Sequence, residues 1–144
     1  MLGIIVTGHG NFATGLQSSL RLIAGDKEDM CFVDFEESDS VADLEKKLVL
    51  AIDSLANTSG ILVLSDLTGG SPFKTAVELS VKNDKKIEIV GGTNLPMVIE
   101  LSMAKEFVDS LDSLTEMALN TGKENIVRFA FKAHEEKNDE EDGI

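Results

Sequence analysis

Four short apolar runs, rich in branched residues and bounded by Gly, Asp or Ser, recur along the chain. The runs occupy residues 2–6, 30–35, 61–64 and 87–90. Between them the apolar residues recur with the period of an amphipathic helix, as Phe12, Leu16 and Leu20 do after the first run. The sequence therefore predicts buried strands that alternate with helices.

The chain downstream of the fourth run predicts two helices, at about residues 95–104 and 111–119, and a last strand at 126–131. Strands joined by helical crossovers form a parallel sheet with helices on both faces. We therefore expect an α/β fold of the doubly wound kind. It should contain a mainly parallel sheet of four strands flanked by helices, together with a fifth, C-terminal strand.

Length and charge narrow the possible partners. The chain has 144 residues, enough for one domain, which we expect to span residues 1–131. Residues 132–144 include six acidic residues and only two apolar ones, and are predicted to form a solvated, disordered tail. With 26 acidic against 13 basic residues, the net charge of −13 has the wrong sign for binding nucleic acid. Nucleic acid is therefore not an expected partner.

Neither cysteine chemistry nor membrane insertion is indicated. The single cysteine, Cys31, has no second cysteine with which to form a disulfide, and no Cys/His cluster has the spacing of a metal site. No basic leader is present, and no run approaches the roughly 18 consecutive apolar residues of a membrane span. We expect a cytoplasmic protein with no cofactor and no metal.

Two polar loops stand out in this order of elements. If strands 2 and 3 lie on opposite sides of strand 1, the loops after strands 1 and 3 part at a topological switch point, where such folds bind ligands. The first loop reads TGHGNF from Thr7, and the second reads SDLTGGSP from Ser65. Any chemistry is therefore expected at these loops.

The first loop also fits a dinucleotide-binding fingerprint. Gly8, Gly10 and Ala13 satisfy G-x-G-x-x-G/A after a strand and before a helix. Asp34 lies about twenty residues further on, where an acid would receive a ribose hydroxyl. A dinucleotide needs two mononucleotide-binding halves, however, and this chain supplies little more than one. A small dinucleotide-binding protein therefore stays an alternative hypothesis.

His9 supports a competing interpretation, phosphoryl transfer. Imidazole is nucleophilic and largely neutral near pH 7, so it accepts a phosphoryl group without a separate base. A carboxylate on one ring nitrogen, here Asp66, would fix the tautomer and leave the other nitrogen to attack. These two residues are the candidate catalytic pair.

Helix N-termini would bind the accepted phosphoryl group. We expect it near the start of the first helix, beside Gly10, because the free N–H groups and the helix dipole favour anions there. The second loop precedes the third helix and should add further donors. The expected donors of that loop are the backbone N–H groups and hydroxyl of Gly69, Gly70 and Ser71.

Each of these residues also has a purely structural explanation. His9 would be a loop residue, Asp66 a turn residue and Ser71 the N-cap of the third helix. Nearby apolar residues would by default belong to the core, but exposed side chains around the site would form a docking patch for partner proteins. The candidates for that patch are Phe12, Leu67, Phe73, Pro96 and Met97.

Three separated motifs give the chain a specific resemblance. Residues 9–16 read HGNFATGL, residues 66–73 read DLTGGSPF, and residues 94–97 read NLPM. In this order and spacing they resemble the enzyme IIA component of the mannose-family sugar phosphotransferase system. The resemblance implies that His9 becomes a phosphohistidine and that Asp66 supports its ring.

The resemblance also implies partners. A IIA component receives its phosphoryl group from phospho-HPr and passes it to a IIB component, expected here in trans, while the membrane components IIC and IID act indirectly in sugar uptake. Members form homodimers by exchanging a C-terminal strand, here residues 126–131. The transported sugar is not readable from a IIA sequence. The phosphotransfer subunit of dihydroxyacetone kinases shares the fold and the early histidine, and stays an alternative.

Overall fold

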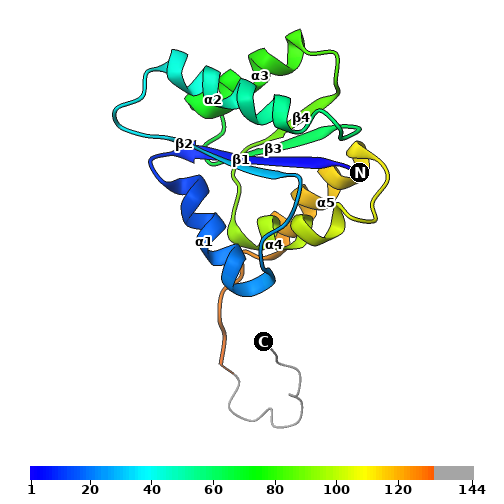
Figure 1. Ribbon diagram of the computed structural model, residues 1–144. Coiled ribbons are helices and arrows are strands. Elements are labelled where there is room, and N and C mark those ends of the chain that lie inside the picture. The colour runs from blue at the N-terminus through cyan, green and yellow to red at the C-terminus, as the bar shows by residue number, and fades with distance from the viewer. Residues whose placement is uncertain (132–144) are drawn as a thin grey trace.

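The computed structural model describes residues 1–131, and the predicted acidic tail, 132–144, lies outside the described residues. Strands and helices alternate in the expected order as far as the end of the last helix (Figure 1). The elements are β1 (Gly3–His9), α1 (Phe12–Ala24), β2 (Met30–Phe35), α2 (Val41–Ser54), β3 (Ile61–Ser65), α3 (Ser71–Lys82), β4 (Ile87–Val90), α4 (Leu95–Ala104) and α5 (Leu111–Glu124).

The four strands form one parallel sheet in the order β2-β1-β3-β4. β2 and β3 therefore lie on opposite sides of β1, as a topological switch point requires. Thr7 of β1 pairs with Ser65 of β3, and His9 of β1 pairs with Phe35 of β2. The expected doubly wound α/β sheet is confirmed, and the loops after β1 and β3 leave its carboxyl edge as neighbours.

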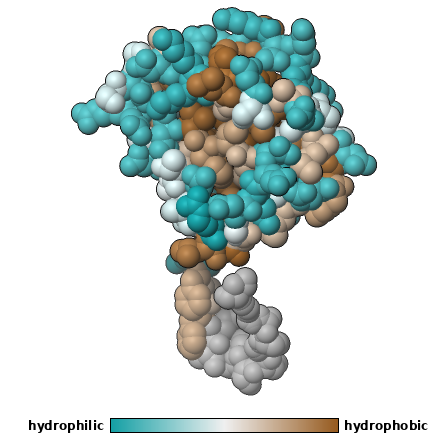
Figure 2. Space-filling model, viewed as in Figure 1, coloured by the Kyte–Doolittle hydropathy of each residue, from teal (hydrophilic) through white to brown (hydrophobic). Residues whose placement is uncertain are grey.

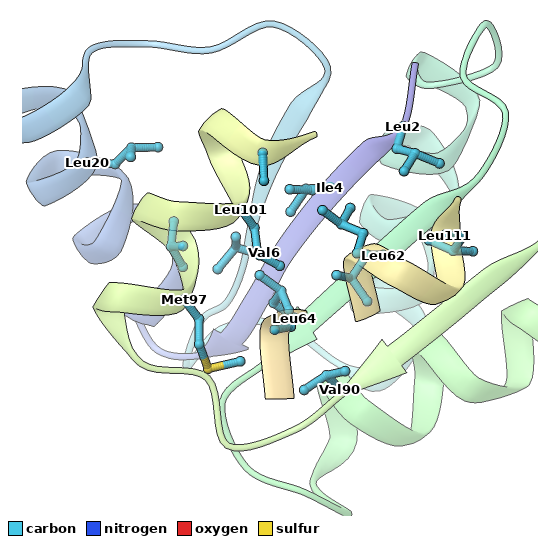
Figure 3. Packing of buried hydrophobic residues seen from close by; sticks show 14 of the residues in the cluster. Leu2, Ile4, Val6, Leu20, Leu62, Leu64, Val90, Met97, Leu101 and Leu111 are labelled. Atoms are coloured by element: carbon cyan, nitrogen blue, oxygen red, sulfur yellow. The ribbon is translucent and has the colours of Figure 1, made fainter. Parts of the chain in front are cut away.

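Helices cover both faces of this sheet. α2 and α3 lie on one face, and α1, α4 and α5 lie on the other (Figure 1). Figure 3 shows the larger of the two cores, where Ile4 and Val6 of β1 face Leu101 of α4. Ile5 points to the opposite face and packs in the second core with Leu48 of α2. Alternate side chains of a strand thus fill two cores, which explains why the strands read as continuous apolar runs.

The starts of α2 and α3 differ in their capping. Ser40 and Asp43 form the expected capping pair at α2, because Ser40 Oγ accepts the Asp43 N–H at 3.1 Å and Asp43 Oδ2 accepts the Ser40 N–H at 2.9 Å. At α3 the N-cap is Gly70, and Ser71 is the first helical residue. The prediction that Ser71 caps α3 is therefore wrong by one position. Since Gly70 has no side chain, the first turn of α3 has no side-chain cap.

The predicted fifth strand does not form within the single described chain. Residues 126–131 follow α5 without strand pairing, and in Figure 1 they run away from the sheet. The side chains of Ile126, Val127, Phe129 and Phe131 are all at least 76% exposed. Figure 2 shows this apolar segment standing off the body of the molecule. A strand needs a neighbouring strand for its backbone hydrogen bonds, and residues 126–131 pair with none within the single described chain.

Candidate active site

The candidate site lies at the carboxyl edge of the sheet, between the ends of β1 and β3. The register that pairs Thr7 with Ser65 continues for one residue, since the Asp66 N–H donates to the Thr7 carbonyl at 3.2 Å. His9 and Asp66 therefore leave the sheet side by side, although 57 positions separate them in the chain.

One carboxylate oxygen of Asp66 contacts His9 twice. Oδ2 accepts the backbone N–H of His9 at 2.8 Å and also lies 2.8 Å from ring atom Nδ1. An ionised carboxylate only accepts hydrogen bonds, so the proton between the two side chains belongs to Nδ1. Nε2 of the neutral ring then keeps its lone pair, on a side chain that is 45% exposed. The expected contact of His9 with Asp66 is confirmed, and Nε2 is the ring nitrogen that Asp66 leaves uncovered.

Asp66 is held in its ionised form. Burial of its side chain, which is 15% exposed, would by itself raise the pKa of the carboxyl. The N–H and ring of His9 donate hydrogen bonds to it, and the Leu67 N–H donates to Oδ1 at 2.6 Å. Together these bonds outweigh burial and lower the pKa of Asp66 below its ordinary value. The carboxylate therefore accepts a hydrogen bond from Nδ1–H and leaves the proton on the ring.

Two glycines allow the groups of the site to approach one another. A β-carbon at Gly8 would lie 2.5 Å from Cδ2 of Phe12 and 2.9 Å from Cγ of Asp66. A β-carbon at Gly70 would lie 2.9 Å from Cε1 of His9 and 3.5 Å from Nε2. The absence of a side chain at Gly70 thus lets the start of α3 reach the free edge of the imidazole.

The start of α3, where Gly70 lies against the His9 ring, has unused donors. Within residues 1–131 the backbone N–H groups of Gly69 and Ser71 donate to no other group, and Ser71 adds a half-buried hydroxyl. Such donors, together with the helix dipole, favour an anion. The Gly70 N–H does not contribute as expected, because it donates to the Leu67 carbonyl at 3.0 Å.

Gly10 also differs from its predicted role in binding a phosphoryl group. Its N–H donates to the Phe35 carbonyl at 2.7 Å, and its φ of 59° places it in the left-handed region that glycine adopts easily. Gly10 therefore turns the chain between β1 and α1 and fastens the turn to the end of β2.

The N-terminus of α1 is already occupied by a carboxylate. Asp34, at the end of β2, accepts the Thr14 N–H at 3.0 Å and the Thr14 hydroxyl at 2.6 Å, whereas the N-cap Asn11 makes no side-chain cap. A second anion would be repelled there, which disfavours the expected place of a phosphoryl group at this helix start. Both Asp34 oxygens also accept hydrogen bonds from Thr14, and the residue is only 8% exposed, which disfavours a ribose hydroxyl there.

The predicted docking residues do not form one surface. Leu67 is 61% exposed beside the site, and Phe12 and Phe73 are half-buried near it. Pro96 lies further along, on a groove between α4 and α5. Met97 is only 2% exposed and packs in the core, so its assignment to a docking patch is wrong. α5 covers it, and a β-carbon on Gly122 would come within 2.7 Å of its sulfur.

The sequence analysis gave no role at the site to Phe35 or to the glycine pair Gly91 and Gly92. The ring of Phe35 lies 5.8 Å from that of His9, centroid to centroid, at an interplanar angle of 59°. Gly92 donates its N–H to the Asp66 carbonyl at 3.0 Å. Their positions in the sequence could have identified all three as neighbours of the site, because each lies at the carboxyl end of a strand of the same sheet.

Neither a metal site nor a membrane span is found in the part of the chain that the structure describes. No three side chains of His, Cys, Asp or Glu gather closely enough there to hold a metal ion. None of its helices is long and apolar enough to cross a membrane. The chemistry available at the site is that of an imidazole, a carboxylate and backbone donors.

Comparison with known proteins shows the family and the fold of this chain. Residues 3–119 match the model of the EIIA-man family, described as the fructose IIA component of the phosphotransferase system (PTS). The chain belongs to this family. A crystal structure of the PTS component EIIA from Streptococcus agalactiae superimposes with a TM-score of 0.81 at 35% identity, covering 89% of this chain and 97% of that one. The fold is therefore that of a PTS IIA component.

The sequence relatives are named for different sugars. The PTS mannose-specific EIIAB component of Escherichia coli K12 is 31% identical over 125 residues, 87% of this chain. This chain spans only 38% of the length of that relative. The PTS fructose-specific EIIA component of Bacillus subtilis is 26% identical over 117 residues, 81% of this chain and 80% of its own length. The chain is thus similar to IIA components named for different sugars.

Proposed function

We propose that this IIA component carries a phosphoryl group on Nε2 of His9, received from phospho-HPr and passed to a IIB component during phosphorylation-coupled sugar uptake in the cytoplasm. The observation that carries the proposal is the orientation of the imidazole. Asp66 accepts a hydrogen bond from Nδ1, so Nε2 keeps its lone pair and points toward the start of α3, near the clearance at Gly70.

The transfer step is a displacement at phosphorus. The lone pair of Nε2 forms the new N–P bond while the N–P bond of the donor phosphohistidine breaks, and the donor ring keeps the electron pair of the broken bond. Each ring retains the proton on its other nitrogen throughout, so no external base is needed. His9 becomes positively charged as the bond forms, and the Asp66 carboxylate stabilises that charge.

The negative oxygens of the phosphoryl group would be received at the start of α3. The backbone N–H groups of Gly69 and Ser71 and the Ser71 hydroxyl are the available donors. They would bind the group on the side of the ring away from Asp66, so the carboxylate and the phosphoryl oxygens are kept apart. Transfer to the IIB component is the same step in reverse, with the acceptor nucleophile in place of the donor ring.

Two alternative functions have less support. A dinucleotide-binding role needs Asp34 free for a ribose, whereas both of its oxygens bind Thr14. A dihydroxyacetone kinase subunit would share the histidine, but the matched family model and the named relatives belong to the sugar phosphotransferase system. We therefore favour the sugar branch.

The proposal includes a homodimer that is joined by residues 126–131. Four large apolar side chains of this segment are exposed in the single chain, and apolar patches of this kind mark association surfaces. β2 and β4 are edge strands, each paired on one side only, so a partner segment has a place to add. Exchange between two protomers would cover both the segment and an edge.

The test of the phosphoryl carrier is direct. The protein is incubated with phospho-HPr, and the modified residue is mapped by mass spectrometry under alkaline conditions, which preserve phosphohistidine. The expected result is one phosphoryl group on His9 of the wild type and none on the His9→Gln variant. Adding a IIB component to the phosphorylated wild type should remove the group. Phosphate on His134, or no phosphate on a folded chain, would contradict the proposal.

A further inference from the structure

The loop between β4 and α4 touches the loop that carries Asp66. The Gly92 N–H donates to the Asp66 carbonyl at 3.0 Å, and the Thr93 N–H donates to the Ser65 carbonyl at 3.1 Å. On its other side the Asp66 N–H donates to Thr7 at 3.2 Å. The backbone of Asp66 is thus held from two directions, by β1 and by the loop after β4.

Gly91 and Gly92 make this contact possible in different ways. A β-carbon at Gly91 would lie 2.2 Å from Oγ1 of Thr68 and 2.9 Å from its Cα, so any side chain there would push the Asp66 loop away. Gly92 has open space around it but a φ of 79°, a conformation that L side chains rarely adopt. Gly91 supplies clearance, and Gly92 supplies the turn that aims its N–H at Asp66.

The loop after β4 rests on a firm support. Asn94 begins α4, and its side chain accepts the Met97 N–H at 3.2 Å. The same side chain donates to the Gly122 carbonyl of α5 at 3.1 Å. The glycine pair is therefore fixed to two helices, and a change there is transmitted to the Asp66 loop.

The Asp66 loop carries two parts of the proposed chemistry. Its first residue provides the carboxylate that lies 2.8 Å from His9 Nδ1, and its end provides the Gly69 and Ser71 donors. Such groups act only when held within about 0.5 Å of the productive geometry. A displacement of the loop would weaken both together.

We propose that Gly91 and Gly92 are positioning residues for this site: they set the tautomer of His9 and the place of the phosphoryl donors without touching either. The effect on transfer rests on the proposed function. The effect on the His9 ring does not, because it is measured on the unphosphorylated protein.

The first experiment compares Gly92→Ala with Gly25→Ala. Gly25 follows α1 as its C-cap with a φ of 81° and also has open space around its Cα, so alanine meets an unfavourable positive φ at both positions. Only Gly92 contacts Asp66. Nitrogen-15 NMR of the imidazole reports which ring nitrogen carries the proton, and single-turnover kinetics with phospho-HPr reports transfer.

The expected result separates the two variants. Both should lose similar thermal stability, but Gly92→Ala alone should shift the His9 ring from a single Nδ1–H form toward a mixture of tautomers. Its transfer should slow by about tenfold. An unchanged His9 spectrum in folded Gly92→Ala, or the same spectral change in Gly25→Ala, would overturn the proposal.

The second experiment tests the clearance at Gly91, and it does not depend on the first. Gly91→Ala should change the His9 spectrum, and Thr68→Ala, which removes the hydroxyl nearest to the new methyl, should partly restore it in the double variant. Gly15→Ala in α1, where nothing lies within 4 Å of the added carbon, is the matched control and should leave the spectrum unchanged. A folded Gly91→Ala with a normal His9 spectrum, or a double variant no closer to wild type than the single one, would contradict the assignment.

These readouts also distinguish the two proposals. If wild type shows the Nδ1–H tautomer and the variants lose it while His9 is never phosphorylated, the positioning role stands and the carrier function fails. If His9 is phosphorylated while both folded glycine variants keep the wild-type spectrum, the carrier function stands and the positioning role fails.

Discussion

Gly70 lies so close to the ring of His9 that a β-carbon added to it would come within 2.9 Å of Cε1 and 3.5 Å of Nε2. The clearance joins two features of the site, because the same residue is the N-cap of α3 and the neighbour of the attacking nitrogen. A helix start without a side chain leaves both the N–H groups and the imidazole accessible to one phosphoryl group.

Substitution of Gly70 should therefore slow phosphoryl transfer. Gly70→Ala places a methyl group against the ring and costs about 1 kcal/mol of stability through the poorer N-cap. Gly70→Ser keeps the clash but is a good N-cap, so it separates the two effects. In single-turnover measurements both variants should transfer the phosphoryl group at least about tenfold more slowly than wild type. Only Gly70→Ala should also have a lower melting temperature. A fast Gly70→Ser variant would show that the clearance is unimportant.

The carboxylate of Asp66 should matter more for rate than for folding near neutral pH. It stabilises positive charge that develops on His9 during N–P bond formation, and removing such a contact costs on the order of 2–4 kcal/mol of barrier. Asp66→Ala should fold and transfer at least about tenfold more slowly, equivalent to about 1.4 kcal/mol. NMR should assign the phosphoryl group to Nε2 in wild type. Phosphate on Nδ1 in wild type, or an unchanged transfer rate in Asp66→Ala, would show that Asp66 is only a turn residue.

The same carboxyl should also give folding stability a dependence on acid pH. Hydrogen bonds from His9 and Leu67 overcome the effect of burial and hold the pKa of Asp66 below its ordinary value of 3.8. The ionised form therefore stabilises the fold above that pH, and this contribution is lost as the pH falls through the folded pKa. The difference in unfolding free energy between wild type and Asp66→Asn, from urea titrations, should shrink as the pH is lowered below about 4. A difference that is independent of pH would contradict this assignment.

Asp34 should be a structural residue. It accepts both the N–H and the hydroxyl of Thr14 and so caps α1 from a neighbouring strand. Asp34→Ala should lower the free energy of unfolding by about 1–2 kcal/mol, as loss of a helix cap does, and a double-mutant cycle with Thr14→Val should show coupling. Calorimetric titration of wild type with NAD should give no binding heat, whereas saturable binding that Asp34→Ala weakens would restore the dinucleotide hypothesis.

The sequence was sufficient to predict the sheet and the central contact of the site. Residues 30–35 and 87–90 are strands as expected, because branched apolar runs between glycine-rich and polar loops suit a sheet buried on both faces. The contact of His9 with Asp66 was expected from a switch point between the first and third strands and from the ability of a carboxylate to orient an imidazole. Both predictions depend on local pattern and chain topology, which a single sequence contains.

Other features depended on contacts between distant segments. Met97 looked available near the site, but α5 covers it. Gly10 and Gly70 looked like phosphoryl donors, but their N–H groups bond to Phe35 and Leu67. Whether an N–H group is free depends on which carbonyl lies opposite in the folded chain, and no pattern in the local sequence records that.

Leu67 should contribute to docking rather than to chemistry. It is 61% exposed next to the site, whereas Leu22 on α1 is an equally apolar control that is 89% exposed. Leu67→Ala should weaken the apparent affinity for phospho-HPr by about tenfold, as loss of one central apolar contact does, and leave the rate at saturation unchanged. Leu22→Ala should change neither. A Leu67→Ala variant that binds normally would show that the docking surface lies elsewhere.

The net charge of the chain should also affect docking. Because the chain carries a net charge of −13, association with a basic partner should slow as the salt concentration rises.

The apolar segment at residues 126–131 should decide the oligomeric state. Its exposed side chains have no cover within one chain, so exchange between protomers would remove them from water at about 25 cal/mol per Å² of apolar surface. A chain that ends at residue 131 should behave as the full chain does, because every residue proposed for exchange is kept. A chain that ends at residue 125 should be an unstable monomer or aggregate, because one sheet edge loses its partner. Light scattering at micromolar concentration distinguishes these states. A full-length chain that is monomeric, or a shortened chain ending at residue 125 that stays dimeric, would exclude exchange through this segment.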